Sequence, residues 1–212
     1  VNQLQIARTR SLIVAVAVVL VALGAISLFT PFLGRARLGP MRGIAAPGGS
    51  AMGPMSFGMM REVRSMSDVQ SEFDYMVRMI PHHREAVESA QTLLERTDRA
   101  EMRSFAETII TTQTREIEQM ESWLEAWYPE QDRQVDYQPM MRDYSELSGD
   151  ELDLAFLQDM IPHHMAAVMM SQQLLSQVQV EHPELETLAA SIRRIQMEEI
   201  RQMSQWMDTW FD

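Results

Sequence analysis

The sequence predicts an all-α protein, namely a four-helix bundle built from two helix-hairpin repeats and preceded by an N-terminal transmembrane helix. The prediction rests first on a duplication, because the pentapeptide Met-Ile-Pro-His-His occurs at Met79–His83 and again at Met160–His164. It rests second on an uncharged, apolar run from Ser11 to Leu33, which is long enough to cross a bilayer as a helix.

The duplication extends well beyond the pentapeptide, since residues 73–129 align with residues 154–211. The matching residues in the later part of each copy are Gln113, Glu116, Ile117, Met120, Trp123 and Trp127 in the first, and Gln196, Glu199, Ile200, Met203, Trp206 and Trp210 in the second. The spacing between the two copies is two residues larger for these later residues than for the pentapeptides. The second copy therefore has the longer inter-helix turn. Such repetition indicates one supersecondary unit used twice.

Each copy contains two stretches in which apolar residues recur at steps of three and four, the spacing of a helix face that packs in a bundle. Ser67 and Ser148 begin capping patterns ahead of the first helix of each copy. Asp98 and Pro183 mark the expected starts of the second helices. With a longer crossover at about residues 129–148, these stretches predict a four-helix bundle.

The chain divides into a signal anchor (1–34), a flexible linker rich in Gly, Pro and Met (35–65), and the duplicated bundle (66–212, with repeats 73–129 and 154–211). No convincing Ala-x-Ala site follows the apolar run, which favours an uncleaved anchor over a cleaved, secreted form. The short N-terminal arm favours a bundle outside the cytoplasm, on the periplasmic or cell-surface side. The linker methionines Met52, Met55, Met59 and Met60 are either auxiliary metal ligands or incidental, and we favour the second interpretation.

The bundle is strongly acidic, because all 30 acidic residues lie at or after Glu62 whereas six of the 18 basic residues precede it. This balance argues against nucleic acid as a partner, since that binding relies on neutralising phosphates. It is compatible with attraction of metal cations. The chain has 19 methionines and no cysteine, so the thioether is the soft ligand that remains.

Polar side chains occupy bundle positions that should face the core. His83 and His164 lie on the first helix of each repeat, and Glu116 and Glu199 lie on the second. Buried polar groups must pair with one another or with a ligand, so we predict metal binding in each repeat. The candidate ligands are Met79, His82, His83, Gln113, Glu116, Met120, Met160, His163, His164, Gln196, Glu199 and Met203.

Imidazole and thioether together favour copper, Cu(I) in particular, with Ag(I) as a second soft ion. The structural alternative is a buried His–Glu–Gln network that only sets helix register, and the duplication favours metal binding over it. The methionines found in the second copy alone, Met165, Met169 and Met170, are either core residues or secondary ligands. The four tryptophans are expected in the core at the bundle end, and His182 on the surface.

These motifs resemble those of the domain-of-unknown-function 305 (DUF305) family. The resemblance rests on Met-Ile-Pro-His-His in each copy, on Gln113-x-x-Glu116-Ile117-x-x-Met120, and on Gln196-x-x-Glu199-Ile200-x-x-Met203. It covers about residues 66–211 and implies a ferritin-like four-helix bundle that binds copper and silver outside the cytoplasm.

We therefore expect a non-enzymatic, extracytoplasmic copper-binding or copper-buffering protein without catalytic residues. One alternative is a ferritin-like di-metal oxidase, which requires Glu-x-x-His motifs on two helices. Neither copy has one, because His82-x-x-Glu85 reverses the order and its counterpart is His163-x-x-Ala166. The other alternative is a structural interaction module with buried His–Glu pairs.

Overall fold

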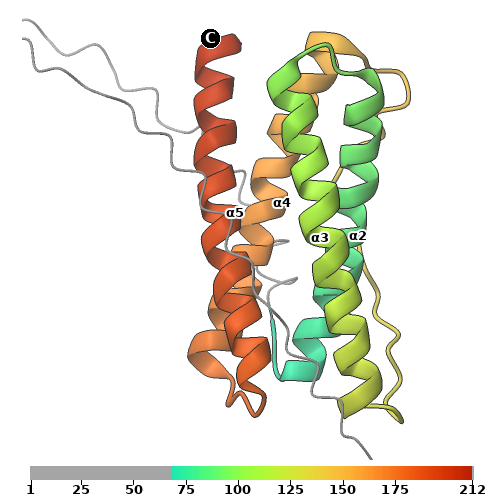
Figure 1. Cartoon of the computed structure of the whole chain (residues 1–212), viewed down its shortest axis with the longest axis vertical. Helices are drawn as coiled ribbons and strands as arrows, with labels where there is room; N and C mark the ends of the chain where they lie inside the picture. The colour runs from blue at the N-terminus through green and yellow to red at the C-terminus, as the bar shows by residue number, and fades with distance from the viewer. Residues whose placement is uncertain (1–67, 212) are drawn as a thin grey trace, which may run out of the picture. The chain divides into compact units, whose positions relative to one another are not determined.

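The computed structural model describes residues 68–211, which form four α-helices and no strand (Figure 1). The helices are α2 (Glu72–Arg96), α3 (Ala100–Trp127), α4 (Gly149–Gln177) and α5 (Pro183–Trp210). Helix α2 packs against α3, α4 packs against α5, and α2 packs against α4. The predicted pair of helical hairpins is confirmed, and the two hairpins meet through their first helices.

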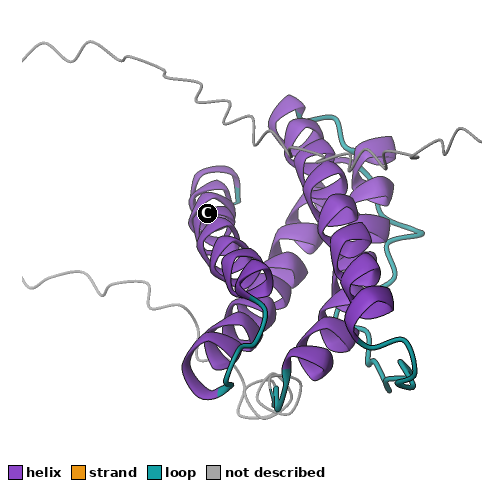
Figure 2. Cartoon of the chain, turned by 60° about the horizontal axis from the view of Figure 1, so that its bottom comes forward, coloured by secondary structure: helices purple, strands orange, loops and turns teal. Residues whose placement is uncertain are grey.

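The two short turns lie at opposite ends of the bundle, and loop segments join all the helices (Figure 2). Residues 97–99 connect α2 to α3, whereas residues 178–182 connect α4 to α5, so the second turn is longer, as the sequence predicts. The crossover between α3 and α4 is an extended segment that runs back along the bundle beside α2.

The expected anchor (1–34) and linker (35–65) lie outside the described residues. Within residues 68–211, none of the helices is long and apolar enough to cross a membrane. The transmembrane part of the predicted architecture is therefore not supported by this structure, and only the bundle is.

The helix starts differ in part from the predicted ones. Ser71 caps α2, because its Oγ accepts a hydrogen bond of 3.1 Å from the N–H of Asp74; the predicted cap, Ser67, lies outside the described residues. Ser148 precedes α4 without a side-chain cap. Gly149 follows it with φ of +55°, a left-handed conformation that a glycine adopts without steric cost. Pro183 occupies the first turn of α5, as predicted.

Pro81 and Pro162 lie inside α2 and α4, and both helices continue through them. A proline has no N–H to donate and clashes with the carbonyl four residues earlier, which costs about 3 kcal/mol in a helix interior. The cost falls on the turn just before each histidine pair. Burial of the surrounding side chains in the bundle must offset it, because isolated helices with such a defect are unstable.

The core contains two apolar clusters, and each takes residues from both repeats. Met79 and Met120 belong to one cluster, and Met160 and Met203 belong to the other. The repeats are not identical, since the hydroxyl of Tyr75 on α2 lies 3.0 Å from that of Ser171 on α4. The equivalent positions in the opposite copies hold Phe156 and Ala90, an apolar pair.

Candidate metal centre

Four buried histidines come together where α2 meets α4. Their exposed fractions are 1% for His82 and 0% for His83, His163 and His164. The rings of His82 and His163 stack, with centroids 3.7 Å apart and 30° between their planes. In the sequence, each pair of adjacent histidines belongs to one repeat. In the structure, His82 of the first repeat stacks on His163 of the second.

The remaining two histidines each face a carboxylate on the second helix of their own hairpin. His83 Nε2 lies 2.9 Å from Glu116 Oε2, and His164 Nε2 lies 2.8 Å from Glu199 Oε2. An ionised carboxylate only accepts hydrogen bonds, so each ring donates from Nε2. In both rings Nδ1 is buried without a hydrogen-bond partner.

Glu85 on α2 supplies a third carboxylate, which sequence reasoning did not place in the site. Its Oε2 lies 3.2 Å from His163 Nε2, and Nδ1 of that histidine is again buried and unpaired. Its counterpart in the second copy is Ala166. Comparison of the two repeats therefore did not identify Glu85 as a site residue, because the comparison selects only polar residues that occur in both copies.

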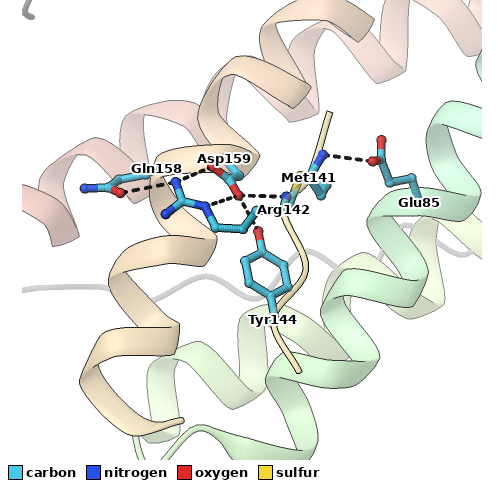
Figure 3. A network of polar contacts seen from close by, with 6 residues as sticks. All are labelled: Glu85, Met141, Arg142, Tyr144, Gln158 and Asp159. Carbon is cyan, nitrogen blue, oxygen red and sulfur yellow. Dashed lines mark hydrogen bonds and ion pairs between the residues drawn. The ribbon is translucent and has the colours of Figure 1, made fainter. Parts of the chain in front are cut away.

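The same carboxylate holds the crossover. Glu85 Oε1 accepts a hydrogen bond of 2.7 Å from the N–H of Met140 and one of 2.8 Å from the N–H of Met141, which Figure 3 shows. Glu85 Oε2 accepts a hydrogen bond from the hydroxyl of Tyr137. The Tyr137 ring also meets His82 edge to face, with centroids 6.4 Å apart. The crossover thus packs against the stacked pair through Tyr137, and Glu85 is one of its attachments.

Burial keeps the stacked rings neutral. The pKa of His82 falls well below its ordinary value of 6.5, first because burial penalises the charged form and then because other histidines lie close by. Burial also lowers the pKa of His163, although Glu85 opposes the shift. Burial alone would raise the pKa of Glu85, but contacts with His163 and Tyr137 outweigh it and lower that pKa. Neutral imidazole is the form that binds metal.

The two predicted glutamines lie at a narrow cavity between α3 and α5. Its lining includes Gln113, Glu116, Gln196 and Glu199. The volume is about 10 Å³, roughly the space that one water occupies. Oε1 of each glutamine is buried without a hydrogen-bond partner. The structure therefore brings the predicted Gln and Glu residues of both repeats to one place, beside the His–Glu pairs.

The four predicted methionines, Met79, Met120, Met160 and Met203, are fully buried in the apolar clusters. In the described part of the chain, no three His, Asp or Glu side chains are arranged to hold a metal ion together.

His182 is not the ordinary surface residue that the sequence predicts. Its Nδ1 lies 2.7 Å from Glu72 Oε2, and its ring stacks on Trp127 with centroids 3.7 Å apart. At the equivalent place in the other repeat, the guanidinium of Arg99 lies 4.7 Å from the ring centroid of Trp210. The tryptophans are partly buried, so they cover the bundle ends instead of filling its core.

Comparison with known proteins places these features in context. The family model described as Domain of unknown function (DUF305) matches residues 72–207. The structure of CopM in the Cu(I)-bound form is 32% identical with a TM-score of 0.61, covering 67% of this chain and 99% of CopM. CopM in the Ag-bound form obtained by co-crystallisation is also 32% identical, with a TM-score of 0.59 and coverage of 67% and 98%.

A more distant structure is the candidate secreted protein DUF305 from Streptomyces coelicolor, which is 26% identical with a TM-score of 0.58. The match covers 65% of this chain and 91% of that protein. No curated protein sequence matches the chain.

Proposed function

The chain belongs to the DUF305 family, and on that basis we propose that it binds and buffers copper, Cu(I) above other ions, in the buried histidine cluster of its bundle. Similarity to CopM, solved in Cu(I)-bound and Ag-bound forms, supports metal binding. The residues of this chain supply the more specific argument.

The observation that carries the proposal is a set of buried ring nitrogens without partners. Nδ1 of His83, His163 and His164 is unpaired while Nε2 of each ring faces a carboxylate. Leaving a buried polar atom unsatisfied costs about 1–3 kcal/mol. A metal-bound histidine characteristically donates its other N–H to a carboxylate, so Nδ1 is the atom we assign to the metal.

This assignment gives the carboxylates a different role from the imidazoles. Glu116, Glu199 and Glu85 would fix the tautomer and orientation of His83, His164 and His163 respectively, through the contacts at Nε2. Neither ring nitrogen of His82 has a hydrogen-bond partner, and the same holds for His163, so both nitrogens of His82 are available. Bound copper would be the cargo of the protein, held by these imidazoles.

The thioethers decide the choice of metal. Met79 and Met120 in the first repeat, and Met160 and Met203 in the second, are the buried sulfur donors on the helices that carry the histidines and their carboxylate partners. Thioether and imidazole ligands favour Cu(I) and Ag(I), whereas Mg, Ca and Mn require oxygen-rich sites. Because the apo protein already has an apolar core, metal should stabilise a folded bundle and not trigger its folding.

We place the bundle outside the cytoplasm. The similarity to a candidate secreted protein and the predicted anchor at residues 1–34 support this location. Use of methionine without cysteine fits it as well, since a free thiol in an oxidising compartment is prone to oxidation.

The test is a titration of metal-free, full-length protein in mild detergent with Cu(I), Ag(I), Cu(II) and Zn(II), followed by elemental analysis. We expect the tightest binding for Cu(I) and Ag(I), and lower stoichiometry after His82→Ala with His83→Ala. His182→Ala is the matched control, because it removes a histidine outside the cluster. Failure of the wild-type protein to retain any of these ions would favour a purely structural His–Glu network.

A further inference from the structure

The cavity between α3 and α5 contains polar atoms that the proposed copper site does not use. Gln113 and Gln196 occupy equivalent positions in the two repeats, and each is 3% exposed. Both residues line the cavity, and Oε1 of each is buried without a hydrogen-bond partner. Buried side-chain oxygens in folded proteins nearly always have a partner, so two unpaired ones at a single cavity indicate a ligand that binds between them.

Two carboxylates line the same cavity. Glu116 and Glu199 belong to its walls, and their side chains are 7% and 14% exposed. Each carboxylate uses Oε2 for the histidine of its own hairpin, which leaves Oε1 for a second partner. The cavity thus combines two amide groups and two carboxylates, one of each from either repeat.

The charge of the cavity favours a cation over a water molecule. The remaining side chains of its lining are Ile109, Thr112, Ile192 and Ile195, so the described residues bring two carboxylates and no Arg or Lys to it. The isoleucines exclude water, and electrostatic interactions are stronger in such surroundings than in solvent. A neutral water molecule could pair with the amide oxygens but would not offset the two carboxylates, whereas a cation would do both.

The size and the donor atoms define the class of ion. The cavity volume is about 10 Å³, which is roughly the space of one water molecule, so a single ion fits and an organic ligand does not. Amide and carboxylate oxygens suit Mg²⁺, Ca²⁺ and Mn²⁺. The lining contains no thioether and no imidazole, so it does not favour Cu(I) or Ag(I).

From these observations we propose that Gln113, Glu116, Gln196 and Glu199 form a second metal site, which binds one oxygen-preferring divalent cation between α3 and α5. The sequence assigns one Gln and one Glu to each repeat, whereas the cavity brings both pairs together. The hairpins meet mainly through α2 and α4, so the bound cation would join their second helices as well. This inference does not rest on the proposed copper-binding function.

Binding can be tested with Mn²⁺ as the probe, because the electron paramagnetic resonance signal of free Mn²⁺ falls as the ion binds. Metal-free, full-length protein in mild detergent and physiological salt should bind one Mn²⁺ per chain. Gln113→Leu/Gln196→Leu should weaken that binding at least about tenfold, since loss of even an outer-shell partner of a metal costs that much. The same variant should bind Ag(I) as the wild type does, because its histidines and methionines are intact.

The matched control is Gln119→Leu/Gln202→Leu, which changes exposed glutamines at equivalent positions of the same two helices. It should bind Mn²⁺ with wild-type affinity. Equal affinity in the wild type and in Gln113→Leu/Gln196→Leu would assign the ion to surface carboxylates and overturn the site. Failure of the wild-type protein to bind Mn²⁺ would also overturn it.

A measurement on the wild-type protein keeps the proposal testable if the leucine variant does not fold. Bound Mn²⁺ should broaden the methyl NMR signals of Ile109 and Ile192, which line the cavity, much more than that of Val180. Val180 precedes α5, whose first residue, Pro183, is about 20 Å along the helix from Gln196. Equal broadening of the three signals would contradict the site. The copper-binding proposal is judged separately, by the histidine variants.

Discussion

Glu85 Oε2 on α2 lies 3.2 Å from His163 Nε2 on α4, so a carboxylate of the first repeat faces an imidazole of the second. The same carboxylate accepts two main-chain N–H groups and a tyrosine hydroxyl of the crossover. One residue thereby connects the histidine cluster to the segment that covers it, and no equivalent residue exists in the other repeat.

Replacing Glu85 by Ala should weaken metal binding and loosen the crossover together. Loss of a carboxylate that orients a metal-binding histidine typically costs 10–100-fold in affinity, and we expect a loss of about that size for Cu(I). Protease cleavage within residues 129–148 should become faster, since the segment loses one of its attachments. Glu88→Ala, an exposed neighbour on α2, is the control for both measurements. Loss of affinity without faster cleavage would separate the two roles of Glu85.

Replacing Glu116 by Ala should destabilise the bundle. The change leaves the Nε2–H of His83 buried and unpaired, and breaking one partner of such a buried pair costs about 3 kcal/mol. The measurement is the free energy of unfolding from urea titration of the metal-free protein. Glu101→Ala, which changes an exposed acid in the first turn of α3, should cost much less. An equal loss in the two variants would mean that the Glu116–His83 contact contributes nothing specific.

The hydrogen bonds that Glu72 accepts should make stability depend on pH. Burial alone would raise the pKa of Glu72, but hydrogen bonds from His182, Tyr128 and Glu181 lower it below the ordinary 4.5. A depressed carboxyl pKa contributes stability that is present above the unfolded-state pKa and is lost as pH falls through the folded-state value. Thermal unfolding between pH 7 and pH 3 should show this loss below about pH 4.5.

Glu72→Gln should flatten that part of the stability profile, because the amide does not titrate. Glu184→Gln, an exposed acid in the first turn of α5, should leave the profile close to that of the wild type. A profile that is the same for all three proteins would show that Glu72 titrates normally in the fold.

Met79→Leu with Met160→Leu should spare stability and lower Cu(I) affinity. Leucine conserves volume and apolarity, so the expected cost is below about 1.5 kcal/mol even though both side chains are fully buried. Loss of the sulfurs removes two soft ligands. Competition with a chromogenic Cu(I) chelator measures the affinity, and urea unfolding measures the stability. Wild-type Cu(I) affinity in this variant would exclude both thioethers from coordination.

The sequence by itself determined the helices and the repeat. Steps of three and four residues place side chains on one helix face whatever the partner, so the four helices, the longer second turn and the crossover follow from residue spacing alone. The same rule predicted that His83 and His164 would be buried. Met79 and Met160, the first residues of the repeated pentapeptide, lie in the same helices as these histidines. The two methionines and the two histidines are all buried.

Only the tertiary structure decided which buried groups meet. Periodicity assigns a residue to a face but does not say which helix packs there, and the contact between α2 and α4 is what brings His82 against His163. The contacts of Glu85 and His182 could not be predicted for a related reason. They involve the crossover and the turn before α5, which have no helical periodicity. Long-range packing determines the side-chain contacts there, and residue spacing does not predict them.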